Sequence, residues 1–333
     1  MRKIFYLLVA FSLTMGSCDE IPADVEQEGN GNTEQPEQEK PEGENPGGDK
    51  PGDEKPTLDQ AGSGETDGYT LVWQDLFDGD ALDETVWNIE VNGNGGGNNE
   101  LQYYRRENVS VGKDEASGCN ALILTAKREK YSNKEFTSGR INSKNKKAFK
   151  YGKIEASIKL PKTANGLWPA FWLMGNDYDQ VGWPRCGEID ILEMGNSNGI
   201  KNNTQDRYFN GACHWGFYKD GAYPNYAKAS TWSYSLQDDQ YHLYTMIWDE
   251  KKISMYVDMD KYPDAKAYYE MGVTGDDSDW SVAKYFHHDF FILFNLAVGG
   301  NFPGIHKASG ITAIPEDGSA SMYVDFVKVY QKQ

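Results

Sequence analysis

Short apolar runs separated by turn-forming residues recur along the chain from residue 69 onward, and they predict β-strands. The runs at 121–129 and 153–160 alternate apolar and polar residues, which predicts strands with one face in water. No long window has the period of a helix, so we expect helix only in short pieces such as 83–87. The clearest apolar runs are YTLVWQDLF at 69–77, ALILTAKRE at 121–129, KIEASIKL at 153–160, YHLYTMIWD at 241–249, KISMYVDM at 252–259, FFILFNLAV at 290–298 and MYVDFVKVY at 322–330.

The order of these elements predicts an all-β fold. The strands are joined by long glycine-rich connections, and we find no repeat of roughly 20 to 50 residues of the kind that marks a propeller or a solenoid. We therefore expect two antiparallel sheets packed into one sandwich over residues 68–333. One of the two sheets is expected to curve into a groove that accepts a polymer.

The first residues have the pattern of a secretory signal. A charged start is followed by an apolar run at 4–13 and by small residues, which together are too short for a membrane span. The sequence up to Cys18 resembles a bacterial lipobox, so residues 1–17 are expected to be a lipoprotein signal peptide and Cys18 to be lipidated. An ordinary signal that contains a cysteine is the alternative. The acidic residues after Cys18 resemble those of outer-membrane lipoproteins displayed on the cell surface, which predicts a lipid anchor as the only membrane contact.

Residues 18–67 differ in composition from the rest of the chain. They consist mainly of Glu, Pro, Gly, Asp, Lys and Gln, and they have too few aromatic and β-branched residues to form a core. We expect a disordered spacer here. The formal net charge of −18 disfavours nucleic acid as a partner and favours a neutral substrate. The remaining cysteines, Cys119, Cys186 and Cys213, allow at most one disulfide, and the sequence does not say which.

The segment CGEIDILEMG at 186–195 carries three carboxylates within an apolar run. On a regular strand Glu188 and Asp190 share one face, while Glu193 points to the other. One extra residue in a β-bulge at 191–192 would restore the parity and turn Glu193 toward the other two acids. The spacing therefore predicts a bulge of the kind that is frequent beside active sites.

The bulge would also set the distance between the two glutamates. Glu188 and Glu193 would lie about four strand steps apart, roughly 13 Å between Cα atoms. Side chains that lean inward would leave their carboxylates roughly 5 Å apart, which is the separation of a retaining glycosidase. Crowding of the three anions should raise at least one pKa, as a general acid requires. The alternatives are a solvated acidic face, which the apolar neighbours disfavour, and a calcium cluster, which needs more oxygen ligands than one strand supplies.

The blocks around these acids resemble glycoside hydrolase family 16, and the extra residue in GEIDILE resembles its laminarinase-like branch. The likeness covers nearly all of residues 70–330. It implies a β-jelly-roll with a concave substrate cleft and endo-acting, retaining hydrolysis, with Glu188 as nucleophile, Asp190 as its assisting partner and Glu193 as general acid/base. The further blocks, which follow the family's order, are WQDLFDG at 73–79, GNNELQYY at 97–104, FTSGRINSK at 136–144, GLWPAFWLMG at 166–175, NDYDQVGWPRC at 176–186, FNLAVGGNFPG at 294–304 and YVDFVKVY at 323–330.

A glycan cleft needs flat apolar rings for the sugar faces and planar polar groups for the hydroxyls. Three tryptophans flank the acid segment, Trp168, Trp172 and Trp183, and a place in the core is their alternative role. For the arginine the alternative is an ion pair with a surface carboxylate, and for the histidine it is a structural role. The sugar contacts indicated by position or by the resemblance are Trp183, Trp172, Asn99, Glu100, Arg140, His214 and Phe302.

Two departures from the family pattern leave the substrate open. Phe302 stands where laminarinase-like members commonly have Trp, and the loop at 195–230 is longer and more aromatic than theirs. Loops on a rigid scaffold set specificity. The expected substrate is a β-1,3-glucan or a mixed-linkage β-1,3/1,4-glucan. The alternatives are an endo-β-galactosidase acting on mucin-type O-glycans or poly-N-acetyllactosamine, and a surface protein that binds glycan without cleaving it.

No cofactor is expected for catalysis. The cysteines and His214 lack the spacing of a zinc site. Many members of the family carry a structural calcium held by backbone oxygens near the first strand and a carboxylate of the last strand, and Asp325 occupies the matching position. A plain edge-strand aspartate is the alternative for Asp325. We expect the protein to be a monomer.

Overall fold

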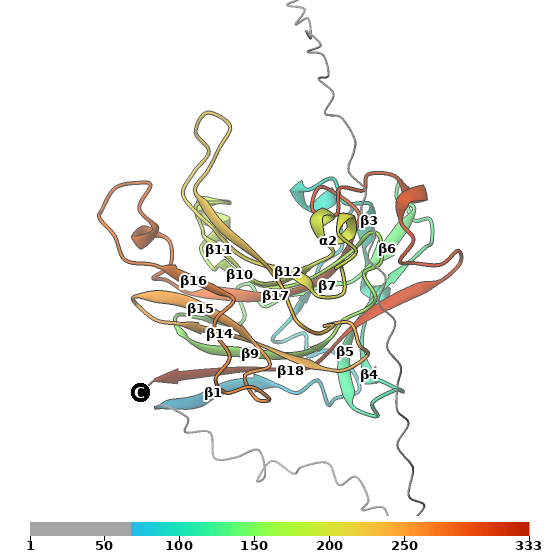
Figure 1. Cartoon of the computed structure of the whole chain (residues 1–333), viewed down its shortest axis with the longest axis horizontal. Helices are drawn as coiled ribbons and strands as arrows, with labels where there is room; N and C mark the ends of the chain where they lie inside the picture. Colours follow the sequence, from blue (N-terminus) through green and yellow to red (C-terminus); the bar gives the residue numbers. More distant parts are fainter. Residues whose placement is uncertain (1–67, 333) are drawn as a thin grey trace, which may run out of the picture. The chain divides into compact units, whose positions relative to one another are not determined.

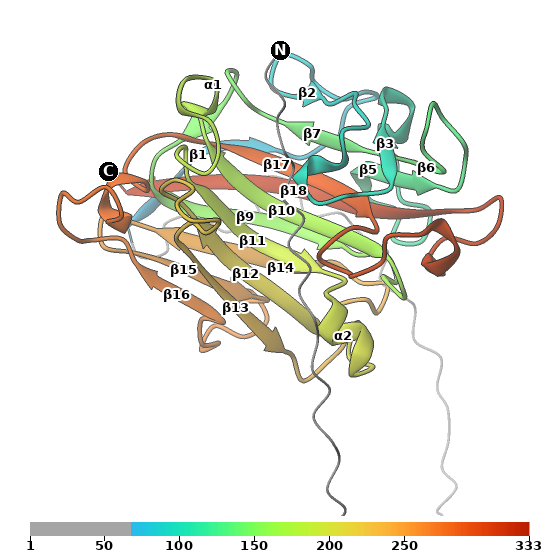
Figure 2. The same ribbon diagram turned by 90° about the horizontal axis from the view of Figure 1, so that it is seen from above.

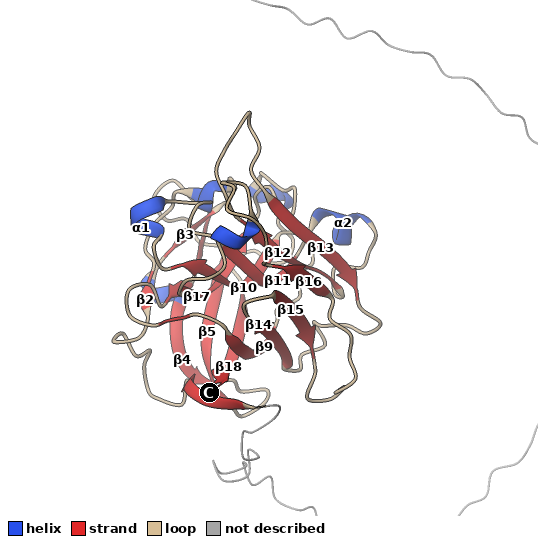
Figure 3. Ribbon diagram, turned by 90° about the vertical axis from the view of Figure 1, so that its left-hand side faces the viewer, coloured by secondary structure: helices blue, strands red, loops and turns tan. Residues whose placement is uncertain are grey.

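The computed structural model describes residues 68–332, and these residues form two sheets packed face to face (Figure 1). Strands dominate the described part, and helices are confined to short pieces at its periphery (Figure 3). The predicted signal peptide, the lipidated Cys18 and the spacer at 18–67 lie outside the described residues. Among residues 68–332 no helix is long and apolar enough to cross a membrane.

Sheet A has ten strands. All its pairings are antiparallel except the short pairing of β3 with β6, which is parallel. Its order is β16 (Tyr269–Gly272), β15 (Lys252–Val257), β14 (His242–Trp248), β9 (Gly152–Lys159), β18 (Ser319–Lys332), β5 (Asn120–Lys127), β6 (Phe136–Ser138) and β3 (Gln102–Tyr104), with β1 (Tyr69–Asp75) beside β18 and β4 (Val109–Lys113) beside β5.

Sheet B has eight strands, all antiparallel to their neighbours. Its strands β10 to β13 lie side by side when viewed from above (Figure 2). The order is β13 (Asn225–Thr231), β12 (Tyr208–His214), β11 (Glu188–Met194), β10 (Leu167–Gly175), β17 (Phe290–Val298), β7 (Arg140–Asn142) and β2 (Asn88–Ile89), with β8 (Ala148–Phe149) beside β17.

Strands that are neighbours in a sheet often come from segments that are distant in the sequence, as in a β-jelly-roll sandwich. In sheet A, β9 lies between β14 and β18, and in sheet B, β10 lies between β11 and β17. The predicted all-β jelly-roll is therefore confirmed. In Figure 1 the two sheets bend together, with the outer face of sheet B on the inside of the bend.

A large apolar cluster fills the space between the sheets. Phe171 of β10 and Phe294 of β17 stack at its centre, with ring centroids 4.8 Å apart. Both of these strands are buried along their whole length. A second apolar cluster, which includes Trp172 and Leu293, covers the opposite face of the same strands. The outer face of sheet B is thus largely buried along β10 and β17.

Two expectations for local structure were wrong. The segment 83–87 forms a single turn, in which the backbone N–H groups of Val86 and Trp87 both donate to Asp83 O, and not a helix. The run at 153–160 does not have a wet face, because Glu155 and Lys159 are buried. β9 lies in the middle of sheet A, and its lysines pair with carboxylates there, so the polar positions are covered by neighbouring side chains.

The helical pieces are short and stand at loop positions. They are α1 (Tyr178–Val181), α2 (Ser197–Lys201) and the 3₁₀ turns η1 (Gly95–Gly97), η2 (Arg106–Asn108), η3 (Val282–Lys284) and η4 (Ala308–Gly310). Within the described chain the three cysteines are free, with Cys186 and Cys213 buried.

Candidate active site

The acid segment forms β11, and the predicted bulge is present in it. Successive residues of β10 pair with Leu192 and Asp190, so Ile191 has no partner on that side. The pairing with β12 shifts at the same place, between Asp190 and Glu193. The extra residue therefore interrupts both ladders at 191–192.

The bulge sorts the side chains of β11 onto two faces. Its apolar side chains all belong to the core between the sheets: Ile189, Ile191, Leu192 and Met194. Glu188 and Asp190 alternate with these residues, and the extra residue returns Glu193 to their side. The three acids are thus gathered on the outer face of sheet B, as the spacing predicts.

A glycine fixes the start of this strand. Gly187 directly precedes Glu188 and has φ of +76°. A Cβ at this position would lie 2.7 Å from Tyr285 O and 2.8 Å from Phe290 Cζ. The backbone needs both the left-handed conformation and the missing side chain here, which only glycine combines at low cost.

Asp190 is buried and the two glutamates are partly buried, and each of the three acids is harder to ionise than in water. Burial raises the pKa of Glu188, of Asp190 and of Glu193 well above the usual range of carboxyl groups. For both glutamates, repulsion from Asp190 raises the pKa further. The raised pKa values keep a carboxyl proton available near neutral pH.

Two basic residues, His214 and Arg140, affect the pKa of Glu188. His214 ends β12 opposite Glu188, and its Nε2 lies 3.3 Å from Asp190 Oδ2 and 3.9 Å from Glu188 Oε1. Burial and Asp190 raise the pKa of Glu188, whereas His214 and Arg140 oppose that rise. These two residues therefore limit the rise in the pKa of Glu188, which is the direction that a nucleophile needs.

Glu193 is held by an indole. Trp168 of β10 donates its Nε1–H to Glu193 Oε1 at 3.1 Å. The ring of Phe302 stacks on this indole, with ring centroids 4.7 Å apart and ring planes 13° apart. Phe302 thus packs against the tryptophan that donates to Glu193, which places it near the acids.

The middle of the outer face carries Trp172 and Arg140. Trp172 lies opposite Asp190 in the pairing of β10 with β11, and its indole donates to Asn295 Oδ1 at 2.7 Å. Arg140 lies over the Trp172 ring at 4.9 Å and pairs with Glu90, Nε to Oε1 at 2.9 Å. The structure therefore places both predicted residues beside the acids, and it also gives Arg140 the carboxylate partner of its alternative role.

Three aromatic rings pack together near His214 and form what we call the aromatic wall: Trp183, Tyr218 and Tyr223. Trp183 packs edge-on against Tyr223 at 4.8 Å and Tyr218 at 5.8 Å, and it lies 6.3 Å from the His214 ring. Both tyrosines belong to the hairpin between β12 and β13, which projects from sheet B as the gold loop in Figure 1.

Several buried polar atoms on this face have no hydrogen-bond partner within the described chain. They include Trp183 Nε1, His214 Nδ1 and Asn210 Oδ1. Buried polar groups are normally paired, so these atoms are candidates for contacts with a hydroxylated ligand.

Asn99 and Glu100 are found at the edge of the site. Asn99 is exposed and donates to Asn301 Oδ1 at 3.0 Å, which ties its loop to the one that carries Phe302. Glu100 is buried, and its Oε2 accepts hydrogen bonds from Gln102 Nε2 at 2.5 Å and from the Tyr104 hydroxyl at 3.2 Å. In this arrangement Glu100 stabilises the loop that presents Asn99.

One group of side chains in the described residues has the compactness of a metal site: Glu188, Asp190 and His214. These are the residues of the acid set itself. Asp325 lies in β18, where the pairing with β9 shifts between Val324 and Phe326. The first strand runs beside it, with Asp75 opposite Val327. The chain segments that the resemblance implies for calcium are thus adjacent, and the calcium site remains a prediction.

Sequence reasoning missed several residues of the site. Trp168 was recognised only as a flanking tryptophan, although it shares the parity of Trp172 along β10. Asn295 and Glu90, which hold Trp172 and Arg140, are supplied by other strands and loops. Tyr223 lies in a loop, where no strand parity indicates its direction.

Comparisons with known proteins agree with this geometry. The sequence pattern of glycosyl hydrolases family 16 matches residues 98–274, more than half of the chain. A solved structure, the GH16 enzyme of the Bacteroides ovatus mixed linkage glucan locus in complex with the product G4G4G3G, is 42% identical to this chain and superposes with a TM-score of 0.68. That match covers 78% of this chain and 100% of the solved one.

Two longer proteins are also similar. The clotting factor G alpha subunit of Tachypleus tridentatus is 37% identical over 267 residues, and the glucan endo-1,3-beta-glucosidase A1 of Niallia circulans is 33% identical over 289 residues. These matches take in 79% and 80% of this chain. They span 34% and 38% of the relatives' own lengths.

Proposed function

Because the chain belongs to glycosyl hydrolases family 16, we propose that it is a retaining endo-β-glycosidase that hydrolyses internal linkages of a β-glucan. The observation that carries this proposal is the bulge in β11, which gathers Glu188, Asp190 and Glu193 on the outer face of sheet B. A protein that only binds glycan has no need of clustered carboxylates with raised pKa values.

The proposed reaction has two steps. In the first, the Glu188 carboxylate attacks the anomeric carbon, the bond from that carbon to the leaving oxygen breaks, and Glu193 gives its proton to that oxygen. In the second, water attacks the same carbon, Glu193 takes the water's proton, and the bond to Glu188 breaks. Asp190 lies between the two glutamates in β11, with its Oδ2 3.3 Å from His214 Nε2, and in both steps it assists Glu188.

Mixed-linkage β-1,3/1,4-glucan is the substrate that we propose first, with laminarin-type β-1,3-glucan next. The support is the 42% identity to the Bacteroides ovatus enzyme, whose solved complex is named for a mixed-linkage product. The Niallia circulans enzyme, at 33% identity, is named for β-1,3-glucan. A β-galactoside glycan remains the alternative substrate because of Phe302 and the aromatic hairpin between β12 and β13.

The test is a substrate panel of barley-type mixed-linkage glucan, laminarin, mucin O-glycans and an agarose-like galactan, with products identified by mass spectrometry. We expect new reducing ends and short oligosaccharides from barley glucan, and none from Glu188→Gln. Release from mucin alone would replace the glucan proposal by the galactosidase one. Glycan binding without new reducing ends, identical in the parent and in Glu188→Gln, would support the non-catalytic alternative.

Azide rescue separates the roles of the two glutamates. In Glu188→Ala, azide can enter from the side of the missing nucleophile, so a β-linked activated substrate should give the α-glycosyl azide. In Glu193→Ala the glycosyl-enzyme still forms, and azide arriving from the opposite side should give the β-glycosyl azide. The same anomer from both variants would contradict the assignment.

We also propose that the domain is tethered to the outer membrane, facing the cell surface, through a lipid on Cys18. The support is the signal-like start and the lipobox resemblance in residues 1–18. Labelled fatty acid should enter the parent protein and not Cys18→Ala, and protease added to whole cells should remove the domain. Unlabelled parent protein released to the medium would contradict the anchor.

A further inference from the structure

The bulge in β11 is held from the opposite sheet. Tyr268, which directly precedes β16 of sheet A, donates its hydroxyl to the carbonyl oxygen of Ile191. The Tyr268 side chain is buried, and its ring packs edge-on against Phe209 of β12 with centroids 4.7 Å apart. Its backbone N–H is fixed in turn to Met255 O at 3.0 Å. A rigid donor from sheet A therefore reaches the bulged residue of sheet B.

The Ile191 carbonyl needs such a donor. Ile191 has no partner residue on β10 or on β12, so it stands outside both ladders. A buried carbonyl without a donor is unfavourable, and strand slippage that removes the bulge would be one way to pair it. In the bulged arrangement the Tyr268 hydroxyl satisfies this carbonyl.

The neighbouring strand leaves room for this tyrosine. Gly211 of β12 lies across from the bulge, between the partners of Asp190 and Glu193. A Cβ at Gly211 would lie 3.0 Å from Tyr268 Cε2 and 3.0 Å from Met255 Sδ. Absence of a side chain at 211 thus lets the tyrosine ring pass between the sheets to the bulge.

We propose that Tyr268 is a positioning residue for catalysis: by holding the Ile191 carbonyl it keeps the bulge in place, and the bulge keeps Glu193 on the face of Glu188. Without the extra residue, Glu193 would point into the core and the general acid/base would be lost from the site. The inference rests on the proposed hydrolysis, and it concerns the proton donor more than the nucleophile, because Glu188 precedes the bulge.

The variant Tyr268→Phe removes the hydroxyl and keeps the ring. The matched control is Tyr269→Phe, because Tyr269 is the adjacent buried tyrosine and its hydroxyl also donates to a backbone carbonyl, Tyr226 O, at 3.1 Å. On barley glucan we expect kcat of Tyr268→Phe to fall about tenfold or more with KM within about twofold, as for a misplaced general acid. Tyr269→Phe should keep the parental kcat even where its Tm falls by the same amount.

A second readout separates positioning from a loss of stability. An aryl β-glycoside with a good leaving group, such as dinitrophenolate, needs no proton from Glu193 in the first step. For Tyr268→Phe, kcat/KM should therefore fall much less on the dinitrophenyl glycoside than on barley glucan. A merely destabilised enzyme would lose the same fraction of activity on both substrates.

Should Tyr268→Phe fail to fold, Gly211→Ala takes its place, because the added methyl presses on the Tyr268 ring and leaves the hydroxyl in the chain. The same split between barley glucan and the dinitrophenyl glycoside is expected. Parental kcat on barley glucan in the folded variant overturns the positioning role, as does an equal loss on both substrates. Lack of activity in the parent protein across the whole panel would refute the proposed function instead.

Discussion

Trp168 donates its indole N–H to Glu193 Oε1 at 3.1 Å. Burial and repulsion from Asp190 raise the pKa of Glu193, while His214 and this hydrogen bond oppose the rise. A donor to the carboxylate stabilises the charged form, so Trp168 sets how far the pKa of the proton donor can climb.

The variant Trp168→Phe should shift the pH profile of hydrolysis. It removes the N–H while keeping a ring against Phe302, so the pKa of Glu193 should rise by up to about one unit. Since the general acid must be protonated to act, the basic limb of kcat/KM should move to higher pH by the same amount. Profiles from pH 4 to 10 would measure it.

The control for this substitution is Trp232→Phe, because Trp232 Nε1 is buried and has no hydrogen-bond partner within the described chain. Its basic limb should coincide with that of the parent. An unmoved limb in Trp168→Phe, or a shift to lower pH, would contradict the role given to the indole.

The hairpin between β12 and β13 should govern substrate affinity. Tyr223→Ala removes the ring that packs edge-on against Trp183 at 4.8 Å. Aromatic contacts of this kind contribute about 0.5–1.5 kcal/mol, so KM for barley glucan should rise roughly two- to tenfold with kcat little changed. The control is Tyr262→Ala, because Tyr262 is exposed and lies between β15 and β16 of sheet A. Its KM should equal that of the parent. Equal KM values in all three proteins would show that the wall does not contact the substrate.

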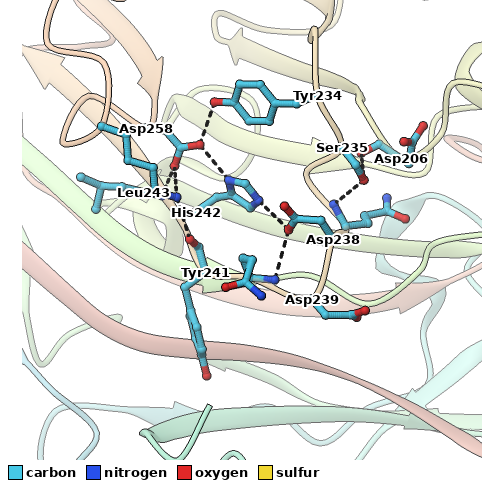
Figure 4. A network of polar contacts seen from close by, with 12 residues as sticks. Asp206, Tyr234, Ser235, Asp238, Asp239, Tyr241, His242, Leu243 and Asp258 are labelled. Atoms are coloured by element: carbon cyan, nitrogen blue, oxygen red, sulfur yellow. Dashed lines mark hydrogen bonds and ion pairs between the residues drawn. The ribbon is translucent and has the colours of Figure 1, made fainter. Parts of the chain in front are cut away.

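A buried histidine in sheet A is clamped by two carboxylates (Figure 4). His242 Nδ1 lies 2.7 Å from Asp258 Oδ2, and Nε2 lies 3.0 Å from Asp238 Oδ1. The Tyr234 hydroxyl also donates to Asp258 Oδ2, at 2.7 Å, and Lys261 Nζ lies 3.5 Å from Asp258 Oδ1. Burial alone would lower the pKa of His242, but the hydrogen bonds and charges of the two aspartates outweigh it and raise the pKa above 6.5.

Stability should therefore depend on pH through His242. Its contribution is complete below the ordinary histidine pKa of 6.5 and is lost as pH rises through the higher folded-state pKa. The His242→Asn variant should lose most Tm relative to the parent at pH 5–6 and least at pH 9, at about 2–4 °C for each kcal/mol. His306→Asn, at an exposed site, should show no such trend. A constant Tm difference from pH 5 to 9 would argue against a charged His242.

The predicted calcium gives a stability test of its own. Asp325 would supply the carboxylate and the neighbouring first strand the backbone oxygens, so calcium binding would favour the folded state. Millimolar calcium after chelation should raise the Tm of the parent and of Asp317→Asn, and should have less effect on Asp325→Asn. No calcium effect on the parent would refute this site.

The positions of the strands could be predicted from local sequence, but the burial of their polar side chains could not. The run at 153–160 forms β9 with the expected register of alternation, yet its polar residues are covered because β9 lies between β14 and β18. Neighbours that are more than 80 residues away along the chain decide this, and alternation within one strand carries no information about them.

The chain's own sequence determined that strands form, that three acids lie on one of them, and that an extra residue turns Glu193 to the side of Glu188. Periodicity and parity are local properties of a strand, which is why they can be read from spacing. Only the tertiary structure decided what holds these groups. Trp168, His214 and Arg140 reach the acids from other strands, and Tyr268 reaches the bulge from the opposite sheet. Such contacts depend on the packing of two sheets, and no spacing along a single strand encodes them.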